Sequence, residues 1–150
     1  MRDGYMRDDP MFIAWQRGHR DNPADRASWW RPWLTLVQEI TARDVEVRRA
    51  RIVSEPASDY VRFEYDITFS NIAAGEQVRW LPRHRATDLS LPGNDFWLLD
   101  GTTVVVNHFG GDGRFVDEEL ITEPATAKLC SSAFEAVWER AVPHEEYRPA

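Results

Sequence analysis

Hydrophobic and polar residues recur along this chain with two periods, and each period predicts a type of element. From 125 to 142, apolar residues such as Ala127, Cys130 and Val137 recur at helical spacing, and Pro143 follows, so a C-terminal helix is predicted. Alternation with β-branched and aromatic residues instead predicts strands. These strands are expected at 45–54, 77–81, 96–99, 103–109 and 114–122.

The first 27 residues are rich in charged residues and irregular in pattern. Their one regular feature is an apolar cluster of Phe12, Ile13 and Trp15, which follows Pro10 at helical spacing. Because proline is tolerated in the first turn of a helix, a short helix is predicted there. We expect one domain spanning 1–150, in which 1–27 is a poorly defined N-terminal segment.

A longer helix is predicted to begin at an N-cap at Ser28. Pro32 would then lie in its first turn, where the missing N–H is tolerated. Trp30, Trp33 and Val37 share one face of this helix. A stripe at helical spacing is first of all a buried stripe, so we expect these side chains in the core rather than on a partner surface.

The segment 60–69 fits both periods. Its apolar residues alternate strictly with polar ones, which is typical of a strand. However, Ser58 or Asp59 offers an N-cap, and Ala74 followed by Gly75 resembles a helix end. We favour the helix, which would join two parallel strands in a βαβ unit; the alternative is an antiparallel hairpin.

These elements predict an α/β fold, or else an α+β fold. The expected architecture is a single mixed sheet of about five strands, with an N-terminal helix, a βαβ crossover helix and a C-terminal helix. The pair Asp100–Gly101 lies between two predicted strands and is a strong hairpin signal. The segment 71–100, with its strand, basic connection and hairpin, is expected at the centre of this sheet.

Charge and cysteine content narrow the function classes. The formal net charge of −7 argues against a surface for nucleic acid, which needs a basic footprint. The single cysteine, Cys130, permits no internal disulfide and fits a reducing compartment. No apolar run of 18 residues is present, so no membrane span is expected. We therefore expect a cytoplasmic protein.

No residue pattern specifies a reaction. The four histidines lack metal-ligand spacing, and the only lysine, Lys128, lies in the predicted C-terminal helix. Aspartates beside glycines, such as Asp100 and Asp112, are typical of turns. We therefore predict no catalytic residues, no metal and no cofactor.

The arginines offer the clearest candidate site. Arg48, Arg49 and Arg51 lie on one predicted strand, and the strand expected beside it carries further basic residues. Together with tryptophans they could bind an oxyanion or an acidic partner; the alternative is that each arginine neutralises a nearby acid. The candidate contacts for a ligand or partner are Tyr60, Glu64, Arg79, Arg83, Asp95 and Trp97.

Three segments carry a resemblance to a known family: RARIVSEPASDYVRFEYDITFSNIAAGEQVRWLP, NDFWLLDG and FEAVWERAVPHEEY. With them, nearly the whole chain resembles the bacterial domain-of-unknown-function family 6879, whose members are typically encoded near small helix-turn-helix regulators. Relatives usually carry more residues before a segment similar to RDGYMRDDPMFIAW, so this chain is expected to be a shortened form. The family brings no established activity.

A fold-level similarity also exists to half of a phospholipase-D-like unit. The catalytic form of that unit needs a histidine, a lysine two residues later and a nearby aspartate. Here the corresponding region is 94–97, and His84 is followed by Arg85 and Ala86, so the catalytic set is incomplete.

From these observations we expect a non-catalytic regulatory or signalling module. Its partner would be a small anionic ligand or a protein such as a helix-turn-helix regulator. The alternative is a phosphoester hydrolase or nuclease of degenerate phospholipase-D-like type, with Asp100, His108 and the arginines in its site.

Overall fold

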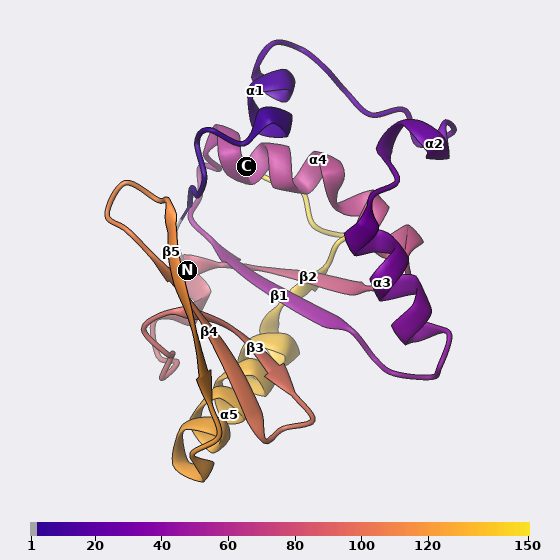
Figure 1. Ribbon diagram of the computed structural model, residues 1–150. Helices are drawn as coiled ribbons and strands as arrows, with labels where there is room; N and C mark the ends of the chain where they lie inside the picture. Colours follow the sequence, from indigo (N-terminus) through magenta and orange to yellow (C-terminus); the bar gives the residue numbers. More distant parts are fainter. Residues whose placement is uncertain (1–2) are drawn as a thin grey trace.

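The strands form two three-stranded sheets in the computed structural model, which describes residues 3–150 (Figure 1). The first sheet, in the order β1-β2-β6, consists of Arg48–Val53, Gln77–Pro82 and Val142–Pro143. The second, in the order β3-β4-β5, consists of Asp95–Leu99, Thr103–Phe109 and Phe115–Ile121. The single mixed sheet of about five strands is therefore wrong, although both α and β elements were expected. Periodicity identifies a strand but not its partner, and β1 does not pair with β3.

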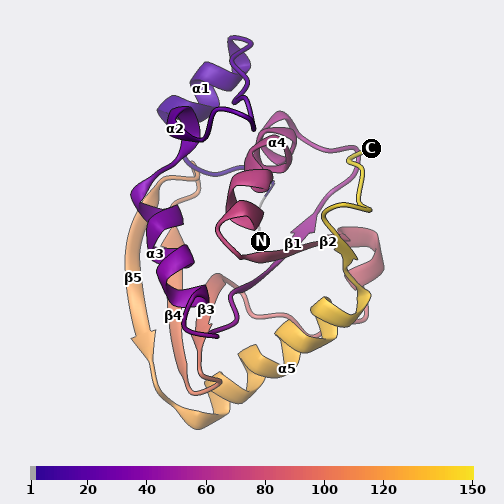
Figure 2. The same cartoon turned by 90° about the vertical axis from the view of Figure 1, so that its right-hand side faces the viewer.

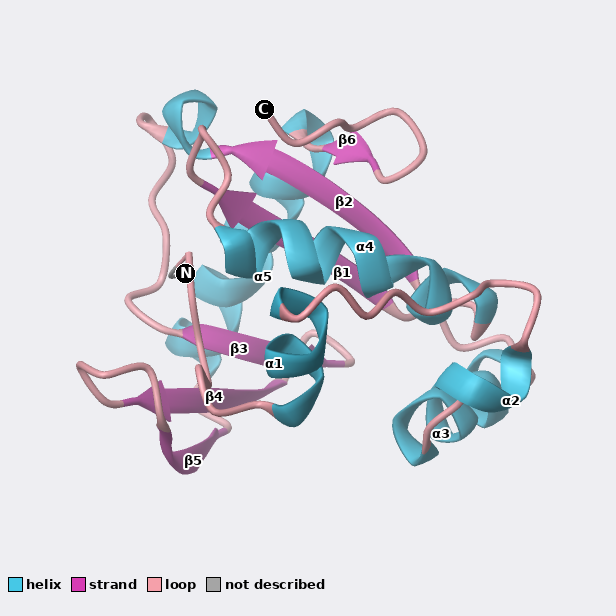
Figure 3. Cartoon of the chain, turned by 90° about the horizontal axis from the view of Figure 1, so that it is seen from above, coloured by secondary structure: helices cyan, strands magenta, loops and turns pink. Residues whose placement is uncertain are grey.

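The predicted βαβ unit is confirmed. Helix α4 runs from Asp59 to Ala73 and joins β1 to β2, which pair in parallel (Figure 3). The Ser58 hydroxyl accepts a hydrogen bond from the Val61 N–H at 3.2 Å, and Gly75 has φ +101°. Both ends of the helix thus carry the residues that such ends require, and these outweigh the alternating pattern between them.

The first sheet is covered on both faces. On one face Val53 packs against Val61 of α4, and on the other Ile52 packs against Val137 of α5, which runs from Pro124 to Arg140. The first half of α5 packs against the second sheet, where Val104 is fully buried beside Cys130. One helix therefore spans both sheets (Figure 2), and Cys130 is a buried core residue.

The two N-terminal predictions have different outcomes. The short helix is confirmed as α1, Pro10–Gln16, which packs on α4 with the Phe12 and Phe63 rings 5.4 Å apart. The helix predicted from Ser28 is confirmed in its main part as α3, Pro32–Thr41, but its start is wrong, because the chain first forms a separate helix, α2, Arg26–Trp29.

Proline explains the break between α2 and α3. Arg31 precedes Pro32 and is extended, with φ −132° and ψ 162°, because proline disfavours the helical conformation of the residue before it. The break also rotates the apolar face. Leu34 and Val37 are buried, whereas Trp33 is 41% exposed, so the expected stripe through Trp33 is wrong.

A short N-terminal segment, residues 3–6, connects the two sheets. The Asp3 carboxylate accepts hydrogen bonds from the Ser54 N–H and hydroxyl, both at 2.7 Å, just after β1. The Met6 N–H donates to the Gly113 carbonyl at 3.0 Å in the turn between β4 and β5. The other end of the chain reaches the same region as Asp3, since the Ala57 N–H donates to the Ala150 carbonyl at 2.7 Å. Among residues 3–150, no helix has both the length and the apolar character needed to cross a membrane.

Candidate functional site

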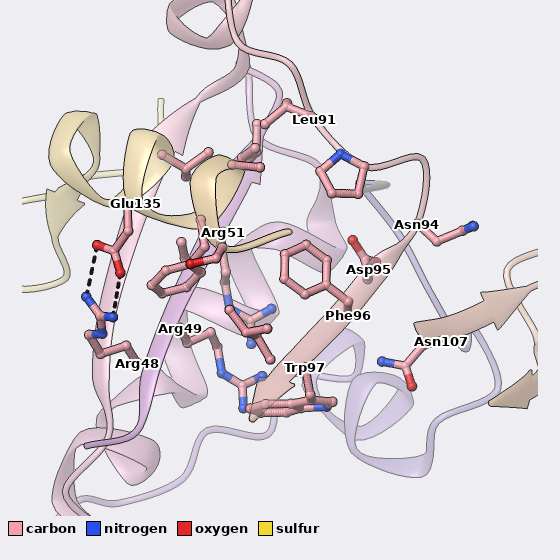
Figure 4. A pocket seen from close by; sticks show the side chains of 18 of the residues that line it. Arg48, Arg49, Arg51, Leu91, Asn94, Asp95, Phe96, Trp97, Asn107 and Glu135 are labelled. Carbon is pink, nitrogen blue, oxygen red and sulfur yellow. Dashed lines mark hydrogen bonds and ion pairs between the residues drawn. The ribbon is translucent and has the colours of Figure 1, made fainter. Parts of the chain in front are cut away.

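A cavity of about 670 Å³ lies between the two sheets (Figure 4). All six residues of β1 line it, as do four residues of β3, the first half of α4 and the middle of α5. The two helices cover opposite faces of β1. The cavity therefore lies against the edge of β1 that β2 does not occupy.

Arg48 belongs to the wall of the cavity that α5 forms. Its guanidinium donates two hydrogen bonds to the Glu135 carboxylate, at 2.7 and 3.3 Å, and lies 4.9 Å from the centre of the Phe134 ring (Figure 4). The hydrogen bonds to Glu135 raise the pKa of Arg48. The Arg48 guanidinium therefore stays charged at neutral pH.

Arg49 belongs to the opposite face of β1. Its Nε–H donates to Glu76, whose side chain is fully buried and also accepts a hydrogen bond from Asn71 at 2.7 Å. The same guanidinium lies 5.1 Å from the centre of the Trp97 ring, at the β3 wall. Arg49 thus joins the two sheets at one end of the cavity.

Arg51 lies two residues after Arg49 in β1, on the same face of the strand. It forms an ion pair with Glu64 of α4 and lies 5.5 Å from the centre of the Trp80 ring. Its Nε atom is buried and has no hydrogen-bond partner among the residues described. A buried donor without a partner is unfavourable, so the Arg51 side chain carries a local energetic cost at the wall of the cavity.

Tyrosines line the other end of the cavity. The Tyr60 hydroxyl donates to Glu64 at 2.8 Å, and burial, with a smaller effect from Glu64, raises the pKa of Tyr60. The Tyr5 hydroxyl donates to Asp95 of β3, and the Tyr5 ring contacts that of Tyr60 edge to face, 6.0 Å between centres. Tyr5 thus brings the segment 3–6 into the lining.

The structure brings four of the six predicted contacts together. Tyr60, Glu64, Asp95 and Trp97 line the cavity, although they come from α4 and β3. Their role in binding stays a prediction.

The other two predicted contacts lie elsewhere. Arg79 faces α5, where it donates to the Trp138 carbonyl at 3.0 Å. Arg83 donates to the Ser54 hydroxyl at 2.9 Å, beyond the end of β1. The basic residues of β1 and β2 thus do not converge on one patch.

The predicted contacts did not include the wall that α5 contributes. Ser131, Phe134 and Glu135 line the cavity from this helix. The only sequence signal was Phe134, on the apolar face of the predicted helix. No local pattern shows which strand edge such a face will approach.

The residues of the hydrolase alternative do not form one site. Asp100 lies at the turn before β4 and lines the cavity, whereas His108 lies near the far end of β4 and bonds to Glu119 at 3.1 Å. At about 3.4 Å per residue, the five steps from Thr103 to His108 span about 17 Å. Within the described part of the chain, no three His, Cys, Asp or Glu residues are grouped as a metal site would require.

Comparisons with known proteins support the resemblance seen in the sequence. No curated protein matches the chain, and no solved structure does. The family model described as "Domain of unknown function (DUF6879)" matches residues 1–149. The chain therefore belongs to this family of unknown function.

Proposed function

We propose that this chain is a non-catalytic binding module whose cavity holds a small ligand or a segment of a partner protein. The observation that carries the proposal is the cavity itself, whose volume of about 670 Å³ lies within the usual range of ligand sites, roughly 300–1,000 Å³. Its lining combines aromatic rings with many charged and polar side chains. The separation of Asp100 from His108 supports binding over hydrolysis.

The ion pairs bear on the kind of occupant. Arg48, Arg49 and Arg51 each already contact a carboxylate, at Glu135, Glu76 and Glu64. A small anion would therefore compete with existing pairs, which weakens the basis for an anionic ligand. A protein partner is better supported, and a helix-turn-helix regulator is the candidate that the family resemblance suggests.

A cavity-filling variant tests the proposal. Ser131 faces the cavity from α5, and the adjacent Ser132 is exposed and does not line it. Ser131→Trp should therefore abolish binding, while Ser132→Trp should keep it and controls for the effect of a tryptophan on α5.

Thermal unfolding of the wild type with a metabolite library, and pull-down with a helix-turn-helix regulator, provide the readouts. A ligand at 100 times its Kd stabilises a fold by about 2.7 kcal/mol. In a domain of this size the unfolding midpoint then rises by about 5–10 °C. If a ligand or partner binds Ser131→Trp as tightly as it binds the wild type, the binding site lies outside the cavity. If no ligand and no partner binds the wild type, the proposal is refuted.

A further inference from the structure

Two strand edges without partner strands border the cavity. Asp95, Phe96, Trp97 and Leu98 are consecutive in β3, so their side chains point to alternate faces of the strand, yet all four line the cavity. The same is true of every residue of β1. Each strand pairs on its other side only, with β4 and β2 respectively, among the residues described. The cavity is thus the gap between two sheet edges.

The backbone of β1 offers hydrogen-bonding groups to this gap. The Gln77 N–H of β2 donates to the Val47 carbonyl at 2.9 Å, and Gln77 is in register with Arg48. In a parallel ladder every second residue directs its N–H and C=O toward the neighbouring strand. Here these residues are Arg49, Arg51 and Val53, so the N–H and C=O groups of Arg48 and Ala50 point toward the gap.

We propose that the occupant is an extended, basic peptide segment of a partner protein, an inference that rests on the binding function proposed above. It would add as a strand to the open edge of β1 and convert the two sheets into one. An edge with free backbone groups is a template for an added strand, and peptide recognition commonly uses this mode.

The charges of the lining favour a basic occupant. Five carboxylates line the cavity against three guanidinium groups. Arg48 and Arg51 pair with carboxylates of the lining, whereas Arg49 pairs with Glu76, which lies outside it. The lining therefore carries an excess of negative charge, to which lysine or arginine side chains of a peptide are complementary. Phe96 and Trp97 add ring faces that can stack against such cations.

Selection from a phage-displayed library of random twelve-residue peptides tests this inference. These peptides are about twice as long as a typical strand. Wild-type chain is the bait, and peptides that also bind Ser131→Trp are discarded. We expect the enriched peptides to carry net positive charge. Their affinity, measured by fluorescence anisotropy, should fall as salt is added, since exposed charge interactions are screened.

Two changes then test strand addition. Ala50→Pro removes an N–H that points to the gap rather than to β2, and proline is tolerated at a strand edge, so the fold should survive by circular dichroism. The selected peptides should bind this variant about two- to ten-fold more weakly, because one backbone hydrogen bond is lost. If Ala50→Pro does not fold, the same question can be asked with the wild-type chain and peptides that are N-methylated at alternate residues. These peptides lack backbone N–H donors and should bind more weakly than their parents.

Each outcome decides the inference. Acidic or neutral peptides, or N-methylated peptides that bind as tightly as their parents, would overturn it. The inference would also be overturned if metabolites bound the wild type but not Ser131→Trp and the selection enriched no peptide. That result would leave the proposed binding function standing. If neither peptides nor metabolites bind, both proposals fail.

Discussion

Replacing Arg49 by methionine should destabilise the fold far more than its position near the surface implies. Arg49 is 24% exposed at its side chain, whereas its partner Glu76 is fully buried. The variant Arg49→Met removes the cation and leaves the Glu76 carboxylate with one remaining donor, the amide of Asn71. An uncompensated charge in the interior is among the most costly single defects.

The magnitude follows from this arrangement. Breaking a buried ion pair by removing one partner typically costs about 3–5 kcal/mol, and the remaining hydrogen bond from Asn71 places the expected loss near 3 kcal/mol. Loss of the contact with Trp97 contributes about 0.5–1 kcal/mol of this. With a urea slope of about 2 kcal/mol/M, the unfolding midpoint should fall by about 1.5 M.

Urea unfolding followed by circular dichroism measures the effect, and two further variants complete the comparison. Glu76→Gln leaves Arg49 in contact with solvent, so it should cost only about 1 kcal/mol. Arg49→Met combined with Glu76→Gln removes both charges and should be more stable than Arg49→Met alone. If the double variant is as unstable as Arg49→Met, or if Arg49→Met costs less than about 1 kcal/mol, buried charge is not what makes Arg49 important.

Two other predictions concern pH and a turn. Burial lowers the pKa of His144, whose Nδ1 accepts a hydrogen bond from the Trp80 indole at 3.2 Å. The stability that this group contributes is thus present above about pH 6.5 and is lost as pH falls through the lowered pKa. Urea midpoints between pH 8 and pH 5 should fall less steeply in His144→Gln, and an unchanged slope would contradict this. Gly75 has φ +101°, and an alanine there would place its Cβ 2.6 Å from the Thr41 hydroxyl oxygen. Gly18 has a similar φ of +95°, but an alanine Cβ there would meet no atom within 4 Å. Gly75→Ala should therefore cost about 2–3 kcal/mol and Gly18→Ala about 1 kcal/mol in the same assay, and equal costs would show that the contact with Thr41 is harmless.

Local patterns predicted most elements but not how the strands assemble. Ser58 and Gly75 settled the ambiguous segment as a helix, because capping residues act on the backbone next to them. The Asp100–Gly101 pair likewise placed the turn between β3 and β4, where both residues have positive φ. The gap between β1 and β3 has no such local signal, since it depends on how α5 packs against residues far apart in the chain.

The candidate site shows the same division. Tyr60, Glu64, Asp95 and Trp97 were predicted from their types and line the cavity. Arg79 was predicted on the assumption that paired strands bring their basic residues together. In the parallel register Arg79 lies beside Ala50, and its side chain contacts α5 instead. Which face a strand residue occupies decides its partners, and that choice is made by tertiary packing.

The meeting of Asp3 and Ala150 at the connection between β1 and α4 makes this chain suited to circular permutation. Asp3 bonds to Ser54 and Ala150 to Ala57, so a linker of a few glycine and serine residues can join these ends. New ends can be opened at Gly111, an exposed turn residue that lies away from the lining of the cavity and has open space where a side chain would begin. Such a permutant would begin just before β5 and end just after β4, and the segment 3–6 would lie within the chain rather than at its start.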